Sequence, residues 1–174
     1  MFKRLFNLLF GQREAPVTET PPVAVREGAV APGTNIRFHP ELIAKLTDDH
    51  RVLLGLFGET SEAAARGDVR AAAEKLEAFR TALQGHLLTE NIRLYVYLEH
   101  LFADDPSSHS LIHAFRHEMD GIGKAVISFF IKYEGLAAHP ELAAAFAQDL
   151  AGIGKVLASR IEREEGTLYP LYTG

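Results

Sequence analysis

The chain has 174 residues, a formal net charge of −5 and a hydrophobic fraction of 47%, values typical of one folded domain with an extension. It has no cysteine, which excludes disulfides, thiolate metal sites and iron–sulfur clusters, so a bound metal must take histidine and carboxylate ligands; these suit iron, manganese or zinc. Mild acidity without a basic run argues against nucleic acid as a partner, and no stretch approaches the roughly 18 apolar residues that would span a membrane.

The chain begins with a short apolar segment, residues 1–10, in which Phe2, Leu5, Phe6 and Leu9 stand at helical spacing. We expect this amphipathic segment either to fold back onto the domain or to dock on a membrane surface or a partner. Its apolar part is too brief for a signal peptide, so we expect a cytoplasmic protein, with peripheral membrane contact through this segment as the alternative.

Residues 11–38 are rich in proline, glycine and threonine and are predicted to be a disordered linker. Residues 39–174 are predicted to form an all-α domain of four helices. The expected helices are Pro40–Arg66, which Gly67 closes, Asp68–Phe102, Ser107 or Ser108 to Gly135, and Pro140–Glu165. Because short loops between long helices force neighbours to run antiparallel, the expected architecture is an up-down-up-down four-helix bundle with a flexible N-terminal extension.

The central motif is His86-x-x-x-Glu90, whose spacing puts an imidazole and a carboxylate on one helical face. Such residues from several helices of a bundle build di-iron and di-manganese sites. Alone, the motif is more often a surface hydrogen bond. The same register recurs near the end of the fourth helix as Arg160-x-x-x-Glu164, and a Leu-Tyr pair follows both copies.

Helical phase separates the buried polar residues from the exposed ones. At about 100° per residue, His50 falls within the apolar stripe of the first helix, Glu90 within that of the second with His86 at its edge, and Glu164 within that of the fourth with Arg160 at its margin. Burying unpaired carboxylates costs several kcal/mol each. The cluster therefore needs a cation, which is either a metal ion or Arg160.

On the third helix, by contrast, the histidines fall outside the apolar stripe. Phe115 and Met119 occupy its core phase, whereas His113 and His117 lie about 160° from the centre of the stripe. We expect both histidines to be exposed unless a bulge rotates the helix. Glu118 is then the candidate ligand that this helix offers near the core.

This pattern resembles the hemerythrin-like (HHE cation-binding) domains, which carry histidine on the first helix, HxxxE on the second, histidine on the third, and HxxxE or HxxxxD on the fourth. The resemblance covers residues 39–174. It implies one or two iron ions with an oxo bridge, ahead of manganese or zinc, and oxygen or another small ligand at the metal. The ligands implied are His50, His86, Glu90 and Glu164, the glutamates bridging the irons.

The chain departs from that pattern at Arg160, which stands where the fourth helix should present histidine and so modulates the site. A four-helix protein with an arginine at this place on its fourth helix is also similar, more weakly, to the anti-sigma regulators of the Rsd/AlgQ type. We expect a non-enzymatic iron-binding protein that senses or stores oxygen, iron or redox state, since no nucleophile with an adjacent base and no cofactor fingerprint is present. The alternative is a metal-free four-helix regulatory protein that binds a protein partner.

Overall fold

The apolar residues at helical spacing form four long helices in the computed structural model, which describes residues 29–173. The elements are α2 (Leu42–Ala65), α3 (Val69–Thr89), the π-helix η1 (Glu90–Tyr95), α4 (Val96–Leu101), α5 (Pro106–Lys132), the 3-10 turns η2 (Leu136–Ala138) and η3 (Pro140–Leu142), α6 (Ala143–Arg163), the π-helix η4 (Glu164–Leu168) and α7 (Pro170–Thr173). The predicted segment 1–10 and the part of the predicted linker before residue 29 lie outside the described residues.

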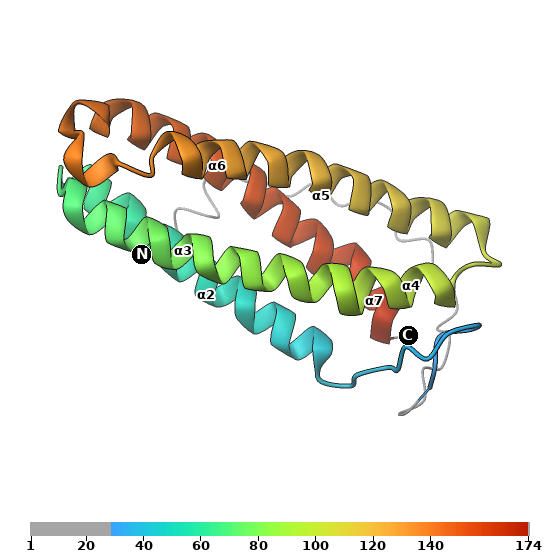
Figure 1. The fold of residues 1–174 in the computed structure, drawn as a ribbon. Coiled ribbons are helices and arrows are strands. Elements are labelled where there is room, and N and C mark those ends of the chain that lie inside the picture. Colours follow the sequence, from blue (N-terminus) through green and yellow to red (C-terminus); the bar gives the residue numbers. More distant parts are fainter. Residues whose placement is uncertain (1–28, 174) are drawn as a thin grey trace.

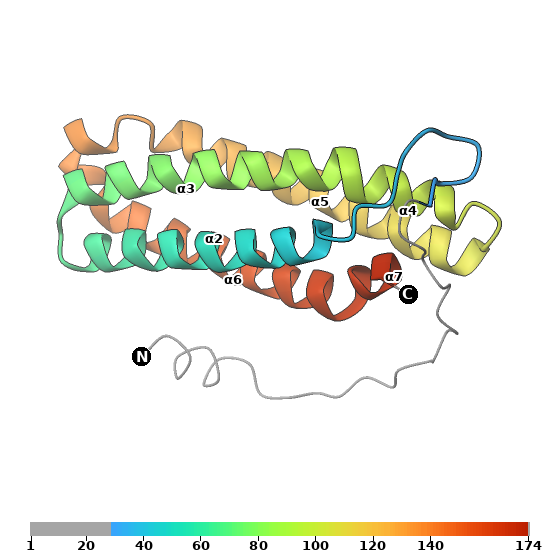
Figure 2. The same ribbon diagram turned by 90° about the horizontal axis from the view of Figure 1, so that it is seen from below.

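The helices run up-down-up-down, as predicted (Figures 1 and 2). Helix α2 packs against α3 and α6, and α5 packs against α4 and α6. Each helix therefore turns one face towards a shared interior. Within residues 29–173 no helix is long and apolar enough to cross a membrane.

The helix ends follow local chemistry, with two corrections. Gly67 closes α2 with a φ of 72°, and the Asp68 side chain accepts a hydrogen bond from the Ala71 amide to cap α3, as predicted. The predicted serine cap of α5 is wrong: Asp105 is the cap, because Pro106 takes the first helical position and the Asp105 carboxylate accepts from the amides that follow. The fourth helix also continues past its predicted end through η4 to α7.

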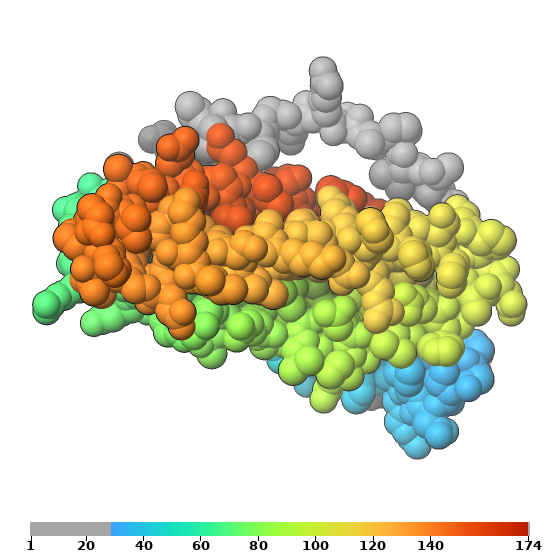
Figure 3. Space-filling view, turned by 45° about the horizontal axis from the view of Figure 1, so that its top comes forward, coloured from blue at the N-terminus to red at the C-terminus, as the bar shows by residue number. Residues whose placement is uncertain are grey.

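Residues 29–38, predicted as part of the linker, instead form an ordered turn at the end of the bundle, blue in Figures 1 and 3. Val30 pairs with Arg37 in an isolated antiparallel bridge. Phe38 stacks on Tyr172 with ring centroids 4.8 Å apart, and Ala31 is buried in the adjoining core. The predicted linker is thus too long by ten residues, because these side chains have an apolar surface to pack against.

The interior has two apolar clusters with a polar layer between them. One cluster, near α4 and α7, includes Leu46, Leu94, Phe115, Leu168 and Tyr172. The other, towards the opposite end, includes Leu53, Phe79, Val126, Phe146 and Leu150. Along α2, along α3 with η1, and along α6 with η4, buried polar residues occupy the positions between these clusters. These residues are His50, His86, Glu90, Arg160 and Glu164.

Candidate metal centre

Two π-helical turns position the glutamates. Glu90 begins η1 and Glu164 begins η4, and the amide of Tyr169 donates to the carbonyl of Glu164 five residues earlier at 2.8 Å. The wider turn places each glutamate and the tyrosine five residues later on the same inward face, Tyr95 in η1 and Tyr169 after η4. Single π turns inside α-helices frequently lie at functional sites.

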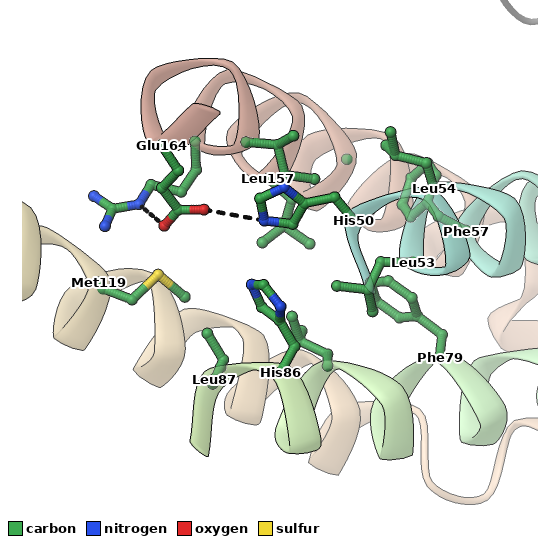
Figure 4. A pocket seen from close by; sticks show the side chains of 14 residues that line it. His50, Leu53, Leu54, Phe57, Phe79, His86, Leu87, Met119, Leu157 and Glu164 are labelled. Atoms are coloured by element: carbon green, nitrogen blue, oxygen red, sulfur yellow. Dashed lines mark hydrogen bonds and ion pairs between the residues drawn. The ribbon is translucent and has the colours of Figure 1, made fainter. Parts of the chain in front are cut away.

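Two histidines face each other across this layer (Figure 4). His50 comes from α2 and His86 from α3, and their ring centroids lie 4.7 Å apart. Nε2 of His50 lies 3.3 Å from Oε2 of Glu164, and Nε2 of His86 lies 3.7 Å from Oε2 of Glu90. His50, His86 and Glu164 each offer a ligand atom within 4.8 Å of the other two, so the predicted ligands from α2, α3 and η4 do converge, with Glu90 at their border.

Carboxylates stand behind both histidines. Nδ1 of His50 lies 2.8 Å from Oε1 of Glu165; in the neutral tautomer that carries its proton on Nδ1, Nε2 presents a lone pair to the centre. Nδ1 of His86 lies 3.8 Å from Oδ2 of Asp49, which also binds Lys45. Metal-bound histidines almost always have such a carboxylate or carbonyl partner on the second nitrogen, which fixes the tautomer and orients the ring.

Two buried polar atoms in this cluster lack a hydrogen-bond partner within residues 29–173: Nδ1 of His86 and Oε2 of Glu90. Leaving a buried polar group unpaired costs about 1–3 kcal/mol. A cation among the side chains of His50, His86, Glu90 and Glu164 would pair Oε2 of Glu90, whereas Nδ1 of His86 faces Asp49 on the outer side. Two imidazoles with two carboxylates suit iron, manganese or zinc. The residues present therefore fit one metal ion.

The pKa values of the layer follow from burial and from the closeness of its titratable groups. Burial and, after it, the nearby His50 together lower the pKa of His86 to about 4, so His86 is neutral. Burial and the charge of Glu164 raise the pKa of Glu90 to about 8. Burial alone would lower the pKa of His50, but hydrogen bonds with Glu164 and Glu165 outweigh it and raise that pKa.

Arg160 fills the other half of the layer and is only 3% exposed. Its guanidinium donates to Oε1 of Glu164 at 2.5 Å, to the Tyr95 hydroxyl at 2.5 Å and to Oε2 of Glu118 at 3.0 Å. The same group lies 4.6 Å from the ring centre of Phe115. Burial would raise the pKa of Glu164, but its bonds to His50 and Arg160 lower it, so this carboxylate stays charged.

Glu118, the expected ligand from the third helix, is not brought to the cluster. Its two oxygens accept hydrogen bonds from Arg163 at 2.6 and 2.7 Å, and one also accepts from Arg160. Two guanidinium groups hold this half-exposed carboxylate at the bundle surface. His113 and His117 are exposed, as predicted, and Phe115 and Met119 take the core positions.

Two tyrosines take part in the layer that sequence reasoning did not assign to it. The Tyr169 hydroxyl donates to Oε1 of Glu90 at 3.0 Å and lies 3.2 Å from Nε2 of His50. The Tyr95 hydroxyl accepts from Arg160. Each tyrosine thus contacts the other half of the repeat, and the Leu-Tyr pair shared by the two copies of the motif was the available signal.

A small cavity of about 40 Å³ opens beside the histidines, large enough for a few atoms. Its walls are mostly apolar, and Figure 4 shows the two histidines and Glu164 among the side chains that line it. The side chains that line it include Leu53, Phe57, Leu83, Met119 and Leu157. A cation in the layer would border this cavity.

Comparison with curated proteins and with solved structures gives no match. A family model described as the hemerythrin HHE cation binding domain matches residues 41–172, which is most of the chain and all four helices. The match spans every residue of the buried layer. The chain therefore belongs to the hemerythrin HHE cation-binding domain family.

Proposed function

We propose that this protein binds a single iron ion through His50, His86, Glu90 and Glu164. The observation that carries the proposal is the unpaired buried Oε2 of Glu90, which lies 3.7 Å from Nε2 of His86 and beside His50, whose Nδ1 is already paired with Glu165. A metal ion would take electron pairs from this carboxylate and from both imidazoles at once. The carboxylates of Glu165 and Asp49, which face the outer nitrogens of the two histidines, support the same assignment.

Arg160 limits the proposed site to one ion. Its guanidinium carries a permanent positive charge and already takes one oxygen of Glu164 and the Tyr95 hydroxyl. A second cation in that half of the layer would meet a like charge at short range, in surroundings where Coulomb repulsion is weakly screened. We therefore propose a mononuclear centre in place of the paired irons that the family resemblance implies.

The role proposed for the centre is sensing or storage of oxygen, iron or redox state, without catalysis. The apolar cavity beside the histidines supports this role, because its volume suits a small ligand and excludes a larger substrate. An iron ion with four protein ligands keeps a position for such a ligand. We place the protein in the cytoplasm.

A second candidate function is a metal-free regulatory scaffold that binds a protein partner. Two observations favour it: Arg160 already neutralises Glu164, and the raised pKa of Glu90 lets that carboxyl stay protonated near neutral pH. In that case the layer needs no ion.

Iron content distinguishes the two candidates. Protein purified after expression with iron, and analysed for metal content, should hold about one iron per chain, lost in His86→Ala and in Glu90→Gln. His100→Ala, an exposed histidine of α4, is the control and should keep its iron. Wild-type protein without metal and with melting unchanged by chelator would refute the iron proposal and favour the scaffold.

A further inference from the structure

Three histidines form a row on the outer face of α5. His109, His113 and His117 follow one another at four-residue intervals, so each lies about 40° further round the helix than the last. All three are exposed and line one shallow surface depression, together with Ser110 and Glu118. Figure 3 shows α5, yellow to orange, running along the outside of the bundle with its outer face uncovered.

These side chains stabilise no contact in the part of the chain that the structure describes. Within residues 29–173 none of the three imidazoles takes part in a side-chain hydrogen bond or an ion pair, although the half-buried Arg116 and the exposed Lys132 of the same helix are paired with carboxylates. The apolar core on the opposite side of α5 is complete without them, through Phe115, Met119 and Val126. The rings are therefore free to turn towards a ligand.

Histidines four residues apart on a helix are a known metal-chelating arrangement, as the paired histidines of the HExxH motif illustrate. Imidazole nitrogens suit zinc, copper and nickel. The neighbouring carboxylate of Glu118 is not free to join, since both of its oxygens accept hydrogen bonds from Arg163. The row thus contains two overlapping chelating pairs, which share His113.

We propose that α5 carries a second metal site, on its surface, which holds one divalent transition-metal ion such as Ni²⁺, Cu²⁺ or Zn²⁺ through His113 and either His109 or His117. This site is separate from the buried centre. The ion-paired Glu118 and the buried Phe115 and Met119 lie between the two. It exchanges metal freely with solvent, because no residue in the range 29–173 covers the outer face of the helix.

The test is calorimetric titration of the full chain with Ni²⁺ at mildly alkaline pH. Because His113 belongs to both pairs, His113→Ala should weaken binding by at least about tenfold, the lower end of what loss of a mere supporting residue costs a metal site. His109→Ala and His117→Ala each leave one pair intact and should weaken binding only about twofold, the statistical loss of one of two equivalent modes. His100→Ala should bind like the wild type.

The same titrations in a His86→Gln background separate this site from the buried centre. The surface affinity should be unchanged there, and His113→Ala should retain whatever iron the wild type holds. Wild-type affinity in His113→Ala would overturn the proposal, as would equal losses in all three row variants, which would assign the ion to a different ligand set. Loss of Ni²⁺ binding in His86→Gln alone would place the ion in the buried centre and overturn it too.

Discussion

Replacing Arg160 with leucine tests how the buried layer balances its charge. The guanidinium is 3% exposed and holds Glu164, Glu118 and the Tyr95 hydroxyl at once. Removing one partner of such a buried pair leaves an uncompensated charge and typically costs about 3–5 kcal/mol. For a domain of this size that corresponds to roughly 10–15 °C in melting temperature.

Arg163→Leu is the matched control. Arg163 also bonds Glu118 and lies near Phe115, but its side chain is 48% exposed, so its ion pair is screened by water and should contribute about 1 kcal/mol or less. Thermal melting followed by circular dichroism, with and without chelator, gives the change in melting temperature for each of the two variants. Equal melting of Arg160→Leu and wild type would refute the view that the guanidinium neutralises the layer.

Arg160→His tests the same residue in the opposite direction. It replaces the permanent cation with an imidazole at the position that the family resemblance assigns to a ligand, so the repulsion of a second ion disappears. Iron content should rise from about one towards two per chain, with the melting temperature of the iron-loaded protein held or raised. Iron content that stays at one while stability falls would show that Arg160 does not set the number of ions.

Three further predictions follow from single contacts. Because the pKa of Glu90 is raised to about 8, its carboxyl is protonated in the metal-free protein at neutral pH. Metal binding must release this proton, so the affinity for metal should rise with pH up to about 8 and then level off. Calorimetric titrations in buffers of different ionisation enthalpy should show the proton release. A methyl group added at Gly154 would collide with the ring of Phe57, so Gly154→Ala should destabilise the protein by about 1–3 kcal/mol in urea unfolding. Phe146→Ala should cost about 3–5 kcal/mol because that ring is 1% exposed, whereas Leu88→Ala, at 60% exposed, should stay within about 0.5 kcal/mol.

Helical phase was sufficient to predict which polar residues are buried. His50, Glu90 and Glu164 fall within apolar stripes, and a rotation of 100° per residue holds well over the few turns that separate them from Leu46, Leu83 and Leu150. The same reasoning predicted that the histidines of α5 are exposed. Each apolar stripe contains many residues, so its position on the helix is well defined. A polar residue that falls within the stripe is therefore predicted to be buried.

The π turns and the long-range partners could not be predicted in that way. A single widened turn shifts the phase of a helix only after Glu90 or Glu164, where few residues remain to show it. Tyr169 meets Glu90 from 79 residues away, and Tyr172 meets the backbone of His39 from 133 residues away. Composition likewise predicted disorder for residues 29–38, because composition contains no information on long-range contacts such as the stacking of Phe38 on Tyr172.

The most direct test of the proposed centre is an anomalous difference map at the iron absorption edge, from crystals of the full chain grown after iron loading. The account predicts a single peak bounded by His50, His86, Glu90 and Glu164, with the guanidinium of Arg160 in place beside it. Two peaks about 3.5–4 Å apart, the separation of paired metal sites, would contradict the proposed role of Arg160. A map without any peak in the layer would contradict the iron centre itself.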